Sequence, residues 1–505
     1  MNSPLRKVGV VILVLFGLLF ANLNWVQAYK ADEYRNSPYN SRVRLDEYKR
    51  QRGAVILANG TQVAVSVATE DELKYLRTYP AKEMYAHLLG YKPVNIGPTG
   101  IEASENEFLA GTSDKLFGDR FRDIFTGEQT AGGNILLTIS PTAQEKAFTE
   151  LANNRVGATK GAVVALDPTT GAVKAMVSMP SFDPNALSSH DTNAAQKVYN
   201  DLLANADKPL NNRAVSEIEE PGSVMKVVIA AAGLESLGLQ PDSAIQGGAT
   251  YQAPGTTHKI PNSTGVVCAD SISLQQALTV SCNTAFAKLA VDLGAQRVTD
   301  VATKFGWYQR DLAVGRLDGK GIARGATVAE GTLGELRTSS GGDDKPALAL
   351  SGIGQRDVRI SPMQGAMIAA TVANYGKQMR PYLVQQQVGP DLTTIHYRAA
   401  PQVLQDSCSR ETAGSLQQMM INVVQEGTGK NARIDGYQVG GKTGTAETGD
   451  DEETHGWFVG FALKDGQPIA ATAVFLENAG KGGSAEAARI AGQVMRGMIA
   501  DRAGK

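Results

Sequence analysis

The sequence predicts an α+β protein with one membrane-spanning helix, an N-terminal pedestal domain and a larger C-terminal domain built on a sheet packed against helices. Two observations lead to this fold class: a long apolar run near the N-terminus, and strand patterns at both ends of residues 151–505 with helical patterns between them. With 505 residues, of which 42% are hydrophobic, the chain can bury more than one core. We therefore expect a short cytoplasmic tail over residues 1–7, an anchor over 8–27, the pedestal over 28–150 and the second domain over 151–505.

The anchor is predicted from the unbroken apolar run Val8–Ala21, which follows the basic pair Arg6-Lys7. The run and its apolar continuation are about as long as a bilayer is thick, and the basic flank favours a cytoplasmic N-terminus with the bulk of the chain outside. The alternative is a signal peptide cleaved near Ala28, but the small residues of a cleavage site are poorly placed there. The formal charge of −2 argues against nucleic-acid binding.

The elements of the remaining chain follow from their local patterns. Residues Tyr29–Glu150 are mixed and loop-rich, as expected of a pedestal. The second domain opens with a β-hairpin pattern, closes with two strands and an Ala-rich helix, and contains a Gly-rich loop over residues 331–344 near its site. The expected ranges are Gly161–Leu166 and Ala172–Val177 for the hairpin, Trp457–Phe461 and Ile469–Leu476 for the strands, and Ser484–Asp501 for the helix.

Ser223-Val-Met-Lys226 is the first of three motifs that carry chemistry. Ser223 opens the almost wholly apolar run Val224–Leu234, which predicts a buried helix that begins at the serine. Burial of Lys226 in this helix should lower its pKa toward that of a working base, because a charged and unpaired lysine is costly in an apolar core. Residues i and i+3 share a helix face, so the amine can reach the hydroxyl and activate it as a nucleophile. The alternative is a lysine that extends to solvent from a core helix.

Ser281-Cys-Asn283 is the second motif, and it lies between two helical patterns, 274–278 and 284–293, of which the second ends at Gly294. A hydroxyl and an amide on this turn can relay a proton and hold a substrate amide. The alternative is that both residues are helix N-caps, which is the more common role of Ser and Asn at such a position.

Lys442-Thr-Gly-Thr445 is the third motif, and we expect it on a strand edge where small residues let an acyl substrate lie against the backbone. Thr445 can then offer an N–H to an oxyanion, and Lys442 a positive field to an anionic group. Gly436–Thr443 also fits the phosphate-binding pattern G-x-x-x-x-G-K-T. That pattern requires a helix directly after it, whereas a turn-rich, acidic stretch and two strand patterns follow here. We therefore reject nucleotide binding.

With the three motifs in this order, the chain resembles the class B penicillin-binding proteins, in particular their short actinobacterial type. The resemblance covers nearly the whole chain. It implies a transpeptidase domain related to the serine β-lactamases, with a five-stranded antiparallel sheet flanked by helices, and a D,D-transpeptidase that cross-links peptidoglycan stem peptides through an acyl-serine. Further motifs that carry it are Arg52-Gly53, Gly97–Glu102, Pro180–Pro184, Asn212-Arg213, Glu220–Gly222, Gly352–Gln355, Ser361-Pro362 and His455–Phe461.

The resemblance also assigns a role to each motif residue. Cys282 departs from the Asp or Ser that is common at the centre of the second motif, but the two functional side chains beside it are intact. No metal and no cofactor is implied. The implied roles are Ser223 as nucleophile, Lys226 as base, Ser281 as proton relay, Asn283 as amide ligand, Lys442, Thr443, Gly444 and Thr445 as the substrate-binding strand, and the N–H groups of Ser223 and Thr445 as the oxyanion hole.

The implied partners are stem peptides, β-lactams, the cell membrane and a membrane-embedded glycosyltransferase of the SEDS type. Three alternatives remain open: a D,D-carboxypeptidase, a β-lactam-hydrolysing or β-lactam-sensing acyltransferase, and a catalytically silent cell-wall scaffold. A β-lactamase needs a deacylating carboxylate, and no Glu-x-x-Asn pattern lies between the second and third motifs. The intact Ser223, Lys226 and Lys442 argue against a silent scaffold.

The three cysteines Cys268, Cys282 and Cys408 allow at most one intramolecular disulfide. A bridge between Cys268 and Cys282 would close a short loop around the second motif and leave Cys408 free to react in an oxidising compartment. The alternative is three reduced cysteines that pack as small hydrophobic residues.

Overall fold

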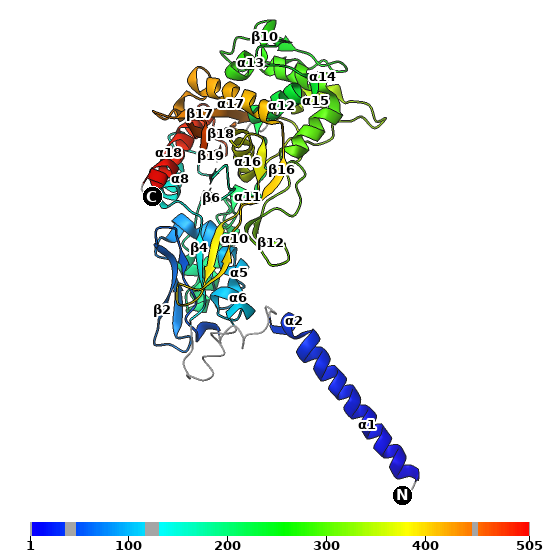
Figure 1. Ribbon diagram of the computed structural model, residues 1–505, viewed down its shortest axis with the longest axis vertical. Helices are drawn as coiled ribbons and strands as arrows, with labels where there is room; N and C mark the ends of the chain where they lie inside the picture. Colours follow the sequence, from blue (N-terminus) through cyan, green and yellow to red (C-terminus); the bar gives the residue numbers. More distant parts are fainter. Residues whose placement is uncertain (1–2, 36–46, 117–130, 447–452, 504–505) are drawn as a thin grey trace.

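The computed structural model describes residues 3–35, 47–116, 131–446 and 453–503. Helix α1 (Ser3–Asn24) continues through a π-helical turn (Trp25–Tyr29) to α2 (Ala31–Arg35), and α1 stands apart from the rest of the chain in Figure 1. Among the described residues, Arg6–Tyr29 is the one helical segment long and apolar enough to cross a membrane, and its apolar window is entirely exposed. This segment contains the residues over which the sequence predicts the anchor.

The pedestal is built on a six-stranded sheet in the order β15-β14-β4-β1-β2-β3. Strands β1 and β4 are parallel, and the other neighbouring pairs are antiparallel. Two of the strands come from the C-terminal half of the chain, so the sheet crosses the boundary at residue 150. The strands are β1 (Val55–Ile56), β2 (Gln62–Ala68), β3 (Tyr75–Thr78), β4 (Asn134–Leu137), β14 (Val384–Val388) and β15 (Ile395–Arg398).

A buried ionic cluster ties the pedestal's short helix α5 (Gly100–Ser104) to this sheet, and the short helices α4 (Ala86–Leu89) and α6 (Asn106–Leu109) contact α5. Glu102 on α5 accepts hydrogen bonds from Arg52 Nε and Arg77 Nε, both at 2.6 Å. Removing one partner of a buried ion pair leaves an uncompensated charge and is strongly destabilising. Two of the short motifs in the N-terminal part, which contain Arg52 and Glu102, therefore have a structural role.

Helix α8 (Pro141–Ala152) begins at the cap Ser140 and packs against the C-terminal helix α18 (Gly483–Ala503). The apolar side chains of α8 belong to one cluster with those of α18 and of the second sheet. Residues 141–150, which the sequence assigns to the pedestal, thus pack against elements of the second domain.

The second domain is built on a five-stranded antiparallel sheet in the order β17-β18-β19-β5-β6. The expected hairpin, the two expected C-terminal strands and the Ala-rich helix are confirmed. Each of their ends lies within three residues of the expected position. The strands are β5 (Gly161–Leu166), β6 (Val173–Met179), β17 (Gln438–Ala446), β18 (His455–Lys464) and β19 (Gln467–Leu476).

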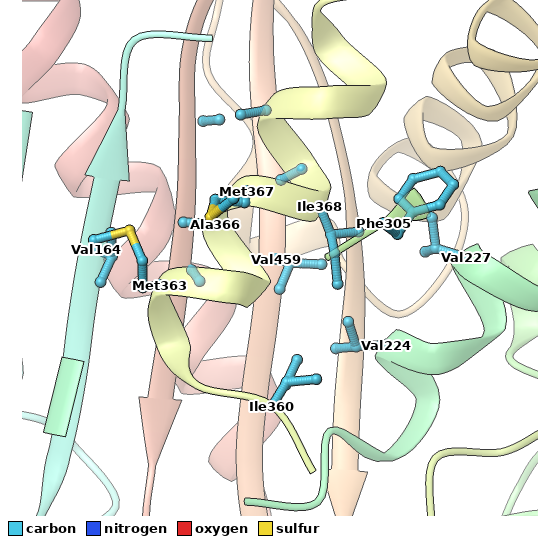
Figure 2. Close-up of a cluster of buried hydrophobic side chains, with 14 of the residues drawn as sticks. Val164, Val224, Val227, Phe305, Ile360, Met363, Ala366, Met367, Ile368 and Val459 are labelled. Carbon is cyan, nitrogen blue, oxygen red and sulfur yellow. The ribbon is translucent and has the colours of Figure 1, made fainter. Parts of the chain in front are cut away.

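Helices cover both faces of this sheet. Helices α8 and α18 lie on one face, and α16 (Pro362–Ala373) packs on the other. Helix α16 carries no charged side chain and every one of its residues is buried, as expected of a helix enclosed by other elements. In Figure 2, Met363 of α16 lies beside Val164 of β5, and Ile368 faces Phe305 and Val227. Helix α16 therefore separates the sheet from α12 (Met225–Leu237), the helix that follows Ser223.

The remaining elements connect these layers, and residues 331–344 contain no regular helix or strand, as expected of a loop. Gly294, with a φ of 77° and a ψ of 164°, ends the first of two helical segments that meet at a kink within α14, as the sequence predicts. The other helices are α9 (Pro184–Leu187), α10 (Thr192–Ala204), α11 (Arg213–Ser216), α13 (Leu274–Val280), α14 (Asn283–Lys304), α15 (Lys345–Ser351) and α17 (Arg410–Gln425). Two-stranded sheets pair β7 (Ala244–Gln246) with β10 (Ser271–Ser273), β8 (Thr250–Tyr251) with β9 (Ile260–Pro261), β11 (Ala313–Leu317) with β12 (Ala323–Thr327), and β13 (Lys377–Met379) with β16 (Val403–Asp406).

Candidate active site

Ser223 lies in a 3-10 turn, Gly222–Val224, that leads directly into α12. Gly222 has a φ of 51°, and a Cβ there would lie 2.3 Å from Thr445 O on β17. Only glycine therefore lets the turn approach the strand so closely. The Gly222 N–H also donates to Gly354 O at 3.0 Å. The serine is fixed between α12, β17 and the segment that contains Gly354.

Lys226, one turn along α12, is completely buried (0% exposed) but is well provided with acceptors. Its Nζ donates to Asn283 Oδ1 at 2.6 Å and to Ser281 O at 2.8 Å, and lies 3.2 Å from Ser281 Oγ. Burial and the nearby Lys442 lower the pKa of Lys226 well below its ordinary value of 10.5. The amine is thus able to act as a base, and the alternative of a lysine that extends to solvent is wrong.

Ser281 connects the first motif to the third. It lies between α13 and α14 in the left-handed region, with a φ of 62°. Its Oγ donates to Ser223 Oγ at 3.0 Å, and the same oxygen accepts from Lys226 Nζ and, at 2.9 Å, from Lys442 Nζ. The contact between Lys226 and the hydroxyl of Ser223 therefore runs through Ser281, whereas the helix spacing suggests a direct contact.

The cap of α14 is Cys282, whose sulfur accepts the N–H of Ala285, so neither functional residue of the second motif acts as the N-cap. The amide of Asn283 is held at both ends: Oδ1 accepts from Lys226, and Nδ2 donates to Pro261 O at 3.1 Å. The loop that contains β9 therefore supports the second motif. The sequence pattern of the motif does not indicate this contact.

Cys268 and Cys282, which are 14 residues apart in the sequence, are joined by a disulfide. The bridge ties the turn of the second motif to the segment before β10. Cys408 is the free cysteine among the described residues. It is half-buried, and burial raises the pKa of its thiol to about 12, which lowers its thiolate fraction and opposes the expected free reactivity.

Lys442 lies within β17, completely buried (0% exposed), and donates to Ser281 Oγ and to Thr443 O, both at 2.9 Å. Burial lowers its pKa to about 7. Thr443 Oγ1 shares a hydrogen bond of 2.5 Å with Thr428 Oγ1, and Thr445 Oγ1 donates to Ser484 at 3.4 Å. Gly444 lies against the nucleophile turn, where a Cβ would be 2.3 Å from Pro221 O.

Gly436–Thr443 does not form a phosphate-binding loop. Residues 438–446 are a continuous strand whose register opposes Lys442 to Val459 of β18, and the lysine is enclosed by protein groups. Among the described residues, no group of three His, Cys, Asp or Glu side chains is arranged to hold a metal ion.

The structure brings the residues of all three motifs into one constellation, and it adds contacts around them that the sequence reasoning did not give. Glu220, three residues before Ser223, pairs with Arg359 at 2.7 Å, and the backbone of Arg359 is bridged to Thr332 at the edge of the Gly-rich loop. Glu219 lies 3.6 Å from His455 Nε2. Thr428 lies after helix α17 and belongs to no sequence motif. Its contact with Thr443 of the third motif therefore depends on the tertiary fold alone.

Comparisons with known proteins agree with this geometry. Residues 161–496 match a family model described as the penicillin-binding protein transpeptidase domain, and residues 52–135 match the penicillin-binding protein A dimerisation domain. The chain is 39% identical over 505 residues to peptidoglycan D,D-transpeptidase PbpA of Mycolicibacterium smegmatis, covering 99% of both chains. It is 38% identical to PbpA of Mycobacterium tuberculosis, covering 99% of this chain and 98% of that one.

Solved structures show the same similarity. The ceftriaxone acyl-enzyme complex of penicillin-binding protein A from M. tuberculosis superposes with a TM-score of 0.82 at 36% identity, over 90% of this chain and 100% of that one. The penicillin G acyl-enzyme complex of the same protein has a TM-score of 0.79 at 35% identity, with the same coverage.

Proposed function

Because this chain belongs to the penicillin-binding protein family of peptidoglycan D,D-transpeptidases, we propose that it cross-links stem peptides through an acyl-enzyme on Ser223. The observation that carries the proposal is the hydrogen-bonded path from Lys226 through Ser281 Oγ to Ser223 Oγ. It joins a buried amine of lowered pKa to a hydroxyl that needs a base.

In the first step, the Ser223 proton passes through Ser281 to the neutral amine of Lys226 while Ser223 Oγ attacks the carbonyl of the penultimate D-Ala. The N–H groups of Ser223 and Thr445 hold the oxyanion. Lys442, Thr443 and Thr445 hold the terminal carboxylate against β17, and Asn283 holds the substrate amide. When the C–N bond breaks, the departing D-Ala takes the proton back through Ser281.

In the second step, the amine of an acceptor stem peptide attacks the acyl-serine. Its excess proton returns to Ser223 Oγ as the ester bond breaks, so Lys226 and Ser281 act in both directions. A β-lactam forms the same acyl-serine through its strained amide but leaves no free departing group.

The full chain in detergent, incubated with a D-Ala-D-Ala donor peptide and a D-amino acid acceptor, tests this proposal. The expected product is the donor with its terminal D-Ala exchanged for the acceptor, detected by mass spectrometry. Release of D-Ala with water alone as the acceptor would instead identify a D,D-carboxypeptidase, and failure of penicillin to acylate the protein would contradict both activities.

We further propose that α1 is an uncleaved anchor, with residues 1–7 in the cytoplasm and the domains outside. Support comes from its length, its apolar surface and the basic pair before the apolar run. The family resemblance also suggests a SEDS-type glycosyltransferase as the partner that supplies glycan strands. Crosslinking in membranes followed by mass spectrometry tests that pairing.

A further inference from the structure

The hydroxyl of Thr428 forms a close pair with a hydroxyl of the third motif. Its Oγ1 lies 2.5 Å from Thr443 Oγ1, and either oxygen can be the donor of this hydrogen bond. Thr443 is almost fully buried, at 6% exposed, whereas Thr428 is exposed. Within the described part of the chain, the Thr428 hydroxyl has no other hydrogen-bond partner. Thr443 is therefore the group on which Thr428 acts.

The backbone next to Thr428 is fixed by two helices. The N–H of Gly427 donates to Asn422 O of α17 at 3.2 Å. A Cβ at Gly427 would lie 2.2 Å from Thr279 O of α13, so glycine is needed for this close approach. Helix α13 leads directly into the turn of Ser281. The Thr428 hydroxyl is thus held at the third motif by a segment that packs on the helix of the second motif.

An anion next to Thr443 would select one direction of the hydrogen bond. Two hydroxyls that share one hydrogen bond leave one O–H group free to donate. When Thr428 is the donor, the free O–H group belongs to Thr443, which can then donate to the anion. The bond received from Thr428 polarises Thr443 and strengthens its own bond to a charged acceptor.

The proposed function, on which this inference rests, supplies the anion: the terminal carboxylate of the donor lies against β17. Thr443 and Thr445 are two residues apart on this strand and share one of its faces. Thr445 Oγ1 has a long contact with Ser484 Oγ, at 3.4 Å, whereas Thr443 Oγ1 has the short contact with Thr428. Of the two hydroxyls, Thr443 is therefore the one that a neighbouring side chain orients closely.

We propose that Thr428 is a positioning residue that orients the hydroxyl of Thr443 toward the terminal carboxylate of the donor. Thr428 donates to Thr443, Thr443 donates to the carboxylate, and solvent hydrates the exposed oxygen of Thr428. Thr428 thus favours ligands that end in an anion without contacting them. Removal of its hydroxyl should weaken the reaction of such ligands about threefold to tenfold, the range expected for one hydrogen bond.

The test compares two thioester donors with the full chain in detergent. An N-acyl-D-alanyl thioglycolate ends in a carboxylate, and the corresponding thioglycolamide ends in a neutral amide. Thiol release gives kcat/KM, which covers the steps up to acylation of Ser223. Thr428→Val keeps the shape of the side chain and should lower kcat/KM about threefold to tenfold for the thioglycolate alone. Thr428→Ser keeps the hydroxyl and should restore the wild-type value.

Thr393→Val is the matched control. Thr393 is an exposed threonine between β14 and β15, and its hydroxyl donates to Asp391 at 2.8 Å. Both donors should react with this variant as they do with the wild-type protein. An equal loss for both donors in Thr428→Val, or no loss for either, would overturn the inference, because a merely structural role affects the two donors alike.

A double variant tests whether Thr428 acts through Thr443. In a Thr443→Val background, Thr428→Val should cause no further loss for the thioglycolate, because the hydroxyl that it orients is already absent. A further loss of the same size would show that Thr428 contacts the carboxylate itself, and would overturn the positioning role. Failure of the wild-type protein to react with either donor and with penicillin would instead contradict the proposed function.

Discussion

Lys226 and Lys442 contact the same oxygen: Ser281 Oγ lies 3.2 Å from the first amine and 2.9 Å from the second. Burial lowers the pKa of both groups, to about 7 for Lys442, and the charge of Lys442 lowers that of Lys226 further. Two buried ammonium groups on one hydroxyl repel each other, so their titrations are coupled. The pair can supply one neutral amine as a base and one cation for a carboxylate.

Ser223→Ala should abolish covalent binding of penicillin. The hydroxyl is the group at the end of the path from Lys226, and no ester can form without it. Intact-mass spectrometry after incubation with penicillin G measures the adduct, and circular dichroism checks that the fold is retained. A variant that still gains the mass of the drug would show that the nucleophile is another residue.

Lys226→Ala should reduce the rate of acylation to the limit of detection, whereas Lys442→Ala should slow it without stopping it. Because the charge of Lys442 lowers the pKa of Lys226, its removal should raise that pKa and move the rising limb of the pH–rate profile to higher pH. Stopped-flow measurement with a fluorescent penicillin from about pH 5 to about pH 10, roughly two units below and three units above neutrality, tests both statements. An unshifted profile in Lys442→Ala would contradict the coupling of the two lysines.

Lys442→Met should raise the melting temperature, and the increase should be larger at about pH 6 than at about pH 9. These two pH values lie about one unit below and about two units above the lowered pKa of Lys442. The pKa of Lys442 is about 7 in the folded chain and 10.5 as its ordinary value. Between these values the unfolded state binds more protons, so stability rises with pH; the cost of the buried charge is fully present below about pH 7. Lys464→Met, at the exposed end of β18, is the control and should show no such pH dependence. A gain that is independent of pH would indicate better packing alone.

Removal of the disulfide in a Cys268→Ser/Cys282→Ser variant should lower the free energy of unfolding by up to about 3 kcal/mol, the value typical of a loop of about 15 residues. Penicillin acylation should also slow, because the bridge fixes the turn that presents Ser281 and Asn283. Calorimetry and acylation kinetics measure the two effects, with Cys408→Ser as the control. Alkylation of Cys282 in native, oxidised protein would show that the bridge is absent.

Protease added to intact spheroplasts should digest the domains and leave a fragment that contains α1. The prediction follows from the basic pair before the apolar segment Arg6–Tyr29, which favours a cytoplasmic N-terminus. Immunoblotting with an antibody to the C-terminal helix reports the digestion, and a cytoplasmic protein serves as the control for intact membranes. Complete protection of the chain would reverse the proposed orientation.

Local sequence patterns predicted those helices and strands whose hydrophobic residues repeat with a regular period. The hairpin β5–β6, the strands β18 and β19 and the helix α18 each have a clear period and clear end signals. Lys226 was conspicuous because a lysine in an apolar helix demands a reason. The path through Ser281, however, depends on how α12, α13 and β17 pack, and no pattern within one segment contains that information.

The same limit applies at the domain boundary. Helix α8 has an ordinary amphipathic sequence, and only its contact with α18, more than 300 residues later, shows to which domain it belongs. Gly294 is a reasonable helix stop on local grounds. Its non-helical backbone angles do end a first helical segment, and a second segment follows it after the kink in α14.

The pedestal sheet has a consequence for how the chain folds. Strand β4 pairs with β14, in a register that joins Leu137 to Val384, so the two partners are roughly 250 residues apart. A ribosome therefore releases β4 long before its neighbour exists, and until then β4 has an open edge that can pair with another chain. The pedestal cannot be completed before most of the second domain has been made. A shortened chain that stops before β14 should accordingly aggregate rather than yield a folded pedestal, so the two large sheets should behave as one folding unit.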